Sequence, residues 1–231
     1  MIRDMTRGNV TRHLVSFSVP IILGNLFQLA YNAVDSIVVG RFAGTGALAA
    51  VGTANPVMNI IILGVSGLCI GASVLMSEYF GARDTEKLRR EFAATLFLGL
   101  FFSAAVLALG LPLAGPLLRL LNVPDEIFPQ ARAYLCIIFL GMPFTFVYNA
   151  YAAAMRSVGD SRTPIRFLAL ASVLNAGLDV AFVAGLHWGA VGAGIATVLA
   201  ESLSAIYVLF IQSVILLRCA LPEQSCGRTG C

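Results

Sequence analysis

The chain has 231 residues, of which 58% are apolar and only 12% are charged. An average soluble domain is roughly 45–50% apolar and about 25% charged, so these few charges cannot cover the surface of a soluble globule. This composition excludes a soluble enzyme and a disordered chain. The net charge of +3 is too small to indicate a nucleic acid as a partner. The sequence therefore predicts a membrane protein, whose first partner is the lipid bilayer.

Apolar stretches between clusters of charge predict the membrane spans in chain order. A spanning helix needs about 20 mostly apolar residues, and the stretches are continuously apolar rather than alternating, which favours helices over barrel strands. Gly185 and Gly189 divide the last stretch into two helices. Six transmembrane helices are expected, at about 14–40, 49–78, 92–118, 130–156, 164–185 and 190–217. The predicted fold class is an all-α membrane protein, a bundle of six transmembrane helices at 14–217 between an N-terminal segment, 1–13, and a short tail, 218–231.

The basic residues predict the orientation of these spans. If residues 1–13 are cytoplasmic, 12 of the 15 Lys and Arg residues lie on the inner side, and only Arg41, Arg119 and Arg132 lie outside. Short loops rich in Lys and Arg stay in the cytoplasm. The expected location is therefore the plasma (inner) membrane, crossed several times, with both termini cytoplasmic.

Asp35 and Asp179 are the two clear cases of an acidic residue inside a predicted span. An ionised side chain costs several kcal/mol to place in the bilayer, so such acids usually face a protein cavity and serve a function. In the first span, Gln28, Tyr31 and Asn32 lie one or two turns before Asp35, which makes one face of that helix polar. An interfacial position for Asp35 and a structural helix–helix tie for Asp179 are the alternatives.

A second polar face brings further candidate ligands. Asn175 lies four residues before Asp179 and therefore stacks on the same face, and Thr197 in the last span lies at a depth that can meet it. Carboxylate, amide and hydroxyl oxygens suit a hard cation such as Na⁺. A proton suits them equally well, because it removes the repulsion between two neighbouring carboxylates. Glu201 either faces a cavity or pairs with a cytoplasmic arginine, and the sequence leaves both open.

Other chemistry-bearing residues are sparse. The chain has five cysteines and two histidines, and none of them shows the spacing of a metal site. No nucleophile–base pair is recognisable, so neither an enzyme nor a metal or organic cofactor is expected. Pro20 removes a backbone hydrogen bond early in the first span, which indicates either a static kink or a hinge.

Several short motifs follow one another along the chain in a fixed order. They are Met5–Leu14 leading into Ser18–Pro20, Asn25–Asp35 followed by Val39–Arg41, Ala54–Pro56, Tyr79–Ala82, Asn149–Pro164, Asn175–Asp179 and Gly192–Thr197. Together they resemble the multidrug and toxic compound extrusion (MATE) family of cation-coupled efflux transporters, over residues 5 to about 217. The resemblance implies antiport, in which entry of Na⁺ or a proton drives an amphipathic, often cationic, drug-like compound out.

The resemblance also implies roles for particular residues. Asp35, Asn175, Asp179 and Thr197 match the family's N-lobe cation site, and Pro20 matches its bend in the first helix. Gln28 and Asn149 match residues that face its cavity, and Tyr31 and Asn32 extend that candidate cavity on the polar face of the first span. The coupling ion, Na⁺ or H⁺, is the only cofactor expected.

The resemblance covers only one of the family's two six-helix lobes. A truncated half is therefore expected, with a second lobe or a homodimer partner to complete the pathway. Two alternatives stay open: a flippase or exporter of lipid-linked polysaccharides from the same superfamily, and an inactive or regulatory membrane fragment. The absence of Lys and Arg from the span interiors argues against the flippase.

Overall fold

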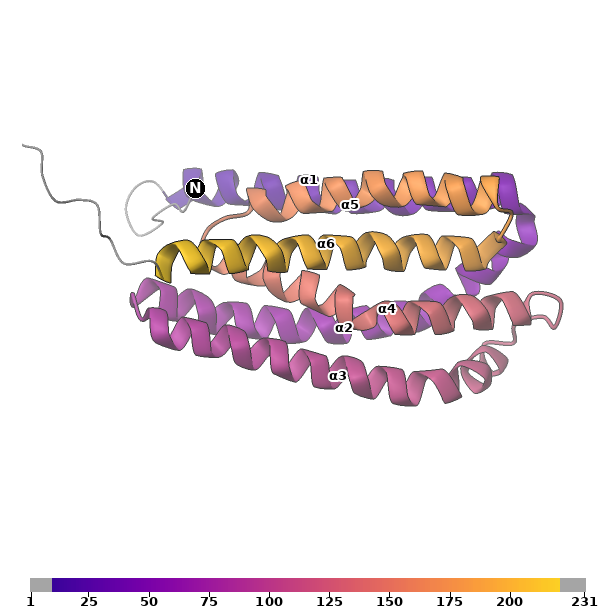
Figure 1. The fold of residues 1–231 in the computed structure, drawn as a ribbon, viewed down its shortest axis with the longest axis horizontal. Helices are drawn as coiled ribbons and strands as arrows, with labels where there is room; N and C mark the ends of the chain where they lie inside the picture. The colour runs from indigo at the N-terminus through magenta and orange to yellow at the C-terminus, as the bar shows by residue number, and fades with distance from the viewer. Residues whose placement is uncertain (1–9, 221–231) are drawn as a thin grey trace, which may run out of the picture.

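The computed structural model describes residues 10–220 and, for most of residues 18–207, the side chains. Six α-helices follow one another, two of them extended by a π-helical turn (Figure 1). They are α1 (Val10–Val38) with η1 (Val39–Ala43), α2 (Gly44–Gly81), α3 (Thr85–Leu120), α4 (Phe128–Ser157), α5 (Arg162–Asp179) with η2 (Val180–Gly185), and α6 (Gly189–Ala220). No strand occurs in the described part of the chain, which confirms the predicted all-α class. The predicted segments 1–13 and 218–231 lie largely outside the described residues.

The first two helices form one uninterrupted apolar run along the chain. Five helical stretches within residues 10–220 are long and apolar enough to cross a membrane, and the first, Ile22–Gly81, has 60 residues. A straight helix of that length would extend about 90 Å, roughly three times the thickness of the hydrocarbon core. The chain instead turns back at Gly44, which has a φ of 85°. Glycine adopts such a positive φ readily, whereas other residues rarely do. The run therefore makes two passes, and the bundle has six.

The helices pack as two groups that meet at α6. In one group α4 packs against both α2 and α3, and in the other α1 packs against α5. Helix α6 contacts both α4 and α5, so it lies between the groups, as Figure 1 shows. The turns η1 and η2 pack against each other at one end of the bundle. Anything held between α1, α5 and α6 thus lies where the two groups meet.

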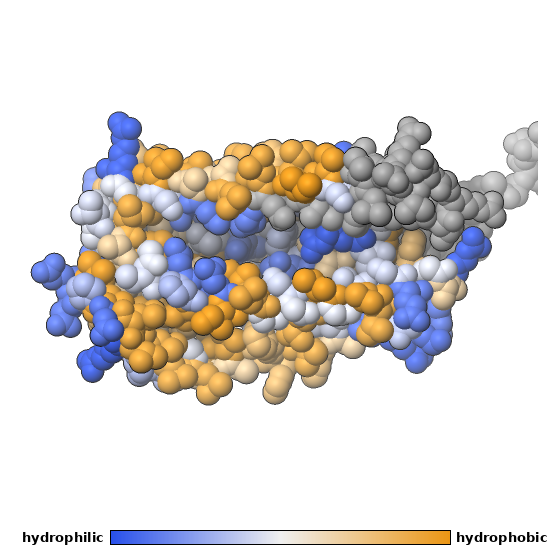
Figure 2. Space-filling model, turned by 180° about the vertical axis from the view of Figure 1, so that it is seen from behind, coloured by the Kyte–Doolittle hydropathy of each residue, from blue (hydrophilic) through white to orange (hydrophobic). Residues whose placement is uncertain are grey.

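Large apolar side chains cover the outside of the bundle. Phe97, Leu120 and Ile60 are each more than 70% exposed, and bands of hydrophobic residues run along the face drawn in Figure 2. In water such a surface would drive aggregation, whereas lipid tails solvate it. The exposed apolar surface is therefore the surface of a membrane-spanning bundle.

Basic residues concentrate at one end of the bundle. The turn between α2 and α3 and the turn between α4 and α5 lie at this end, with Arg83, Lys87, Arg89, Arg90, Arg156, Arg162 and Arg166. The opposite end holds Arg41, Arg119 and Arg132. At the basic end the Asp84 carboxylate accepts a hydrogen bond of 3.0 Å from the backbone N–H of Lys87 and so caps α3. This bond and the Lys87 ammonium hold the pKa of the Asp84 carboxyl below its usual range.

One close contact fixes α3 against α4. Gly99 is buried on α3, and the ring of Phe146 on α4 occupies the space that a Cβ at position 99 would need. Phe146 itself is fully buried. Between membrane helices small residues allow this kind of approach, because packing rather than the hydrophobic effect holds the helices together.

Prolines occur inside several helices without ending them. Pro56 lies within α2, Pro112 and Pro116 lie within α3, and Pro143 lies within α4. Neighbouring membrane helices can satisfy the backbone groups that a proline frees. Pro20 lies within α1, but its side chain is outside the described part of the chain, so its role as a hinge stays a prediction.

Candidate functional site

The two carboxylates singled out in the sequence meet between α1 and α5. Asp179 is the last residue of α5 and is fully buried, and Asp35 is half-buried on α1. Their side chains lie next to each other. Because two neighbouring carboxylates repel each other, the pair favours a proton or another cation between them.

Asn175 and Thr197 complete the cluster. Asn175 is 1% exposed and lies one turn before Asp179 on α5. In the amide orientation that satisfies its neighbours, Asn175 Nδ2 donates to Asp179 Oδ2 at 2.8 Å, and Asn175 Oδ1 accepts from the backbone N–H of Thr197 at 3.2 Å. The Thr197 side chain in turn lies beside Tyr31 of α1. The structure thus brings all four predicted cation ligands together, with Tyr31 beside them.

The cluster has spare acceptor capacity. Oδ1 of Asp35 and Oδ1 of Asp179 are buried and have no hydrogen-bond partner. Among the side chains described, no Lys, Arg or His forms an ion pair with either carboxylate. Buried acceptors without partners are costly, so these two oxygens favour the binding of a cation or a proton.

Local backbone structure positions both carboxylates. Asp179 immediately precedes η2, and Asp35 lies four residues before η1. A π-helical turn carries one residue more than an α-turn, and such turns are frequent at functional sites. Because η1 packs against η2, the two acid-bearing helices are joined at their ends next to the pair.

The candidate cavity residues do not all lie together. Gln28 and Asn32 are exposed on α1, on the same helix face as Tyr31 and Asp35. Figure 2 shows a hollow with hydrophilic residues along the face of the bundle opposite to that of Figure 1. Asn149 on α4 donates from Nδ2 to the backbone oxygen of Thr145 at 2.8 Å, so its amide is used within its own helix.

The sequence left the position of Glu201 open, and it did not find Thr145. In the structure the Thr145 hydroxyl of α4 donates to the Glu201 carboxylate of α6. No arginine pairs with Glu201 among the described side chains, so the cavity-facing alternative is the one observed. Tyr134 is buried on α4 and lies close enough to Asp35, Asp179 and Glu201 to interact with them electrostatically. No sequence signal marks a contact between residues 56 positions apart.

Comparisons with known proteins agree with this fold. Residues 20–181 match the MatE family model. The chain is 35% identical over 207 residues to the probable multidrug resistance protein YpnP of Bacillus subtilis, with 90% of this chain and 46% of that protein covered. A MOP superfamily transporter from Pyrococcus furiosus superposes with a TM-score of 0.84 at 30% identity, covering 90% of this chain and 46% of the transporter. A MATE protein crystallised in a bent conformation also gives 0.84, at 28% identity, with 94% and 50% covered.

The bundle therefore has the fold of one half of a multi-pass membrane transporter. The chain belongs to the MatE family. It spans about half the length of the curated relatives that it matches. Their names include multidrug resistance proteins, and they give no support to the lipid-linked flippase.

Proposed function

We propose that the chain forms one lobe of a cation-coupled antiporter that exports amphipathic or cationic, drug-like compounds. Asp35, Asn175, Asp179 and Thr197 bind the coupling ion, Na⁺ or H⁺, and no other cofactor takes part. The observation that carries this proposal is the pair of adjacent carboxyl groups, each with an unpartnered buried oxygen, inside an apolar bundle. The polar α1 residues Gln28, Tyr31 and Asn32, with Asn149 on α4, belong to the substrate cavity.

Coupling in this proposal is reciprocal. A cation bound by Asp35 and Asp179 draws α1 toward α5 and α6, and a substrate favours the arrangement without the cation. Each ligand then lowers the affinity for the other by the same factor. A membrane potential that is negative inside contributes about 2.3 kcal/mol per charge per 100 mV to cation entry.

A lone lobe needs a partner against which to move. Transporters built from repeats alternate access by rocking one repeat against the other, so we propose that a second six-helix lobe, either another chain or a second copy, completes the pathway. The basic end of the bundle, with Arg83, Arg90 and Arg156, faces the cytoplasm of the plasma (inner) membrane in this proposal, and both termini lie there.

The test is export that depends on an ion gradient. The chain is reconstituted in liposomes loaded with ethidium, and an inward Na⁺ gradient or an inward H⁺ gradient is imposed separately. Export driven by one gradient, and abolished by the ionophore that collapses it, identifies the coupling ion. Export that continues with both gradients collapsed would contradict the proposal, as would its absence under either gradient when the second lobe is supplied.

Asn175 offers a prediction on ion affinity. Asn175→Ala removes the amide that donates to Asp179 and accepts from Thr197, so the carboxylate loses the group that orients it. Groups that orient ligands typically contribute about 10–100-fold to ion affinity, and we expect a loss in that range. Equilibrium binding of the coupling ion measures it. Asn59→Ala, which changes an exposed asparagine on α2, is the control and should leave the affinity unchanged.

A further inference from the structure

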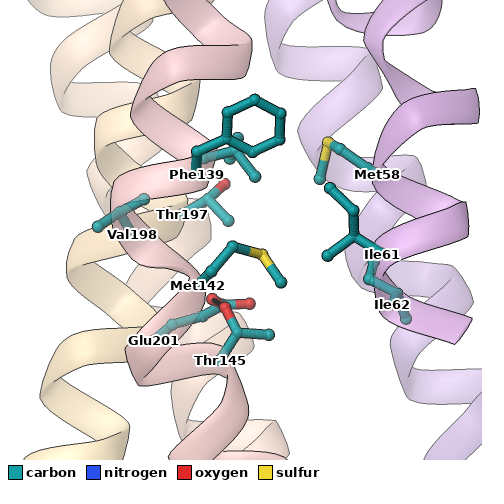
Figure 3. Close-up of a pocket in the computed structure, with 10 residues that line it drawn as sticks. Met58, Ile61, Ile62, Phe139, Met142, Thr145, Thr197, Val198 and Glu201 are labelled. Atoms are coloured by element: carbon teal, nitrogen blue, oxygen red, sulfur yellow. Dashed lines mark hydrogen bonds between the residues drawn. The ribbon is translucent and has the colours of Figure 1, made fainter. Parts of the chain in front are cut away.

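A second acidic residue, Glu201, lies one turn after Thr197 on α6, in a cavity between α2, α4 and α6. The cavity has a volume of about 40 Å³ and is partly enclosed. Figure 3 shows Glu201, Thr145 and Thr197 on one side, facing Met58 and Ile62 of α2. The candidate cation cluster lies between α1, α5 and α6, so the cavity adjoins that cluster and shares Thr197 with it.

The charge of Glu201 is not balanced by the protein. Its carboxylate accepts a hydrogen bond from the Thr145 hydroxyl, and no basic side chain pairs with it within the described residues. One hydroxyl satisfies only part of a carboxylate, which can accept about four hydrogen bonds. An anion in apolar surroundings without a cationic partner is costly, so the site favours a cation supplied from outside the chain.

The remaining walls of the cavity select the kind of cation. Met58 and Ile62 of α2 and Phe139 and Met142 of α4 are apolar, and they contribute most of the lining with other aliphatic residues. A small inorganic cation needs several oxygen ligands around it, which these walls do not supply. An ammonium group on an apolar chain needs one counter-charge and apolar contacts, and aromatic and sulfur-containing side chains contact such groups well.

We propose that this cavity binds the ammonium group of an amphipathic alkylammonium substrate, with Glu201 as its counter-charge. The volume of about 40 Å³ exceeds the roughly 30 Å³ that one water molecule occupies in the liquid, so it admits the charged end alone. The apolar body of the substrate lies along Ile62, which is 40% exposed at the edge of the cavity. This inference rests on the proposed export function and names the substrate class.

The experiment measures charge preference in binding, without any ion gradient. The purified full chain in lipid nanodiscs is titrated with a dansyl-pentylammonium probe and, separately, with the matched uncharged dansyl-pentanol, and fluorescence anisotropy gives both affinities. A hydrogen bond to a charged group favours the charged probe by about tenfold or more. Glu201→Gln should reduce this preference to about onefold, and Glu201→Asp should retain part of it.

A control separates Glu201 from other acids. Glu91→Gln changes a carboxylate that lines a different groove, between α2 and α3, and should keep the full preference. If Glu201→Gln does not fold, Ile62→Trp narrows the cavity while leaving every charge in place, and it should weaken binding of the ammonium probe by about tenfold.

Two outcomes would overturn the inference. One is a full charge preference in Glu201→Gln or, where that variant does not fold, undiminished binding of the ammonium probe by Ile62→Trp. The other is a charge preference that is lost in Glu91→Gln. The binding assay uses no gradient, so it is independent of the export test. If ion-driven export occurs but binding shows no preference for the charged probe, only the proposed ammonium site is refuted. If binding shows that preference but no ion-driven export occurs, only the proposed antiport is refuted.

Discussion

Asparagine in place of Asp35 is expected to abolish ion-driven export while leaving the protein inserted and folded. The substitution keeps the size of the side chain and removes one of the two carboxylates in the cluster. Groups that only orient a ligand contribute about 10–100-fold to ion affinity, so loss of a direct ligand should reduce ion-coupled export by at least about 100-fold. Asp179→Asn should have the same effect, because the two carboxyl groups lie next to each other in one cluster.

The control for these variants is Glu78→Gln. Glu78 is exposed near the end of α2, so the change removes one negative charge outside the cluster and should leave export unchanged. Export is measured under the ion gradient, together with the amount of protein in the membrane and its melting temperature. Undiminished export by Asp35→Asn at normal protein levels would disprove a role for this carboxylate in coupling.

Alanine in place of Gly99 is expected to destabilise the bundle. The added Cβ would collide with the buried ring of Phe146, and a packed core accommodates such an insertion only by shifting side chains and backbone, at a cost of about 1–3 kcal/mol. The contact joins α3 to α4, and α4 also packs against α2 and α6, so the shift cannot stay local. Thermal unfolding in detergent should show a melting temperature lower by several degrees.

Gly67→Ala is the matched control for Gly99→Ala. Nothing lies within 4 Å of a Cβ built at Gly67, and this glycine is exposed on α2. Alanine favours a helix over glycine by about 1 kcal/mol, so the same chemical change should leave stability unchanged or raise it. Adding Phe146→Leu to Gly99→Ala makes room for the new methyl group and should recover part of the loss. Equal effects of alanine at positions 67 and 99 would show that the Phe146 contact is unimportant.

The apolar stretches of the sequence predict the six spans well, but not their ends. The third span was expected at 92–118, whereas α3 runs from Thr85 to Leu120. Its first turns contain Glu86, Lys87 and Arg90, and they continue the helix into water, where hydropathy gives no signal. A capping aspartate, Asp84, fixes that start instead.

The candidate site was predictable only in part. Asn175 and Asp179 are four residues apart on one helix, so their neighbourhood follows from helix geometry. Asp35 could be added because it is an acid inside a span and Thr197 because its depth matches, and the resemblance to a known family supports that grouping. The contact of Glu201 with Thr145 depends on how α4 and α6 pack, and a single sequence carries no information about that packing. The two π-helical turns were also missed, because one extra residue in a turn leaves the apolar pattern intact.

Thr197 belongs to both sites, since it lies beside Asn175 and Tyr31 and also lines the Glu201 cavity. A hydroxyl group has a single hydrogen to donate. When that hydrogen points at the carboxylate cluster, Thr197 can only accept hydrogen bonds from groups in the cavity. When it points into the cavity, Thr197 can only accept from groups in the cluster. One rotation about one side-chain bond therefore decides which of the two sites receives the hydrogen of the Thr197 hydroxyl. This change needs no movement of a helix.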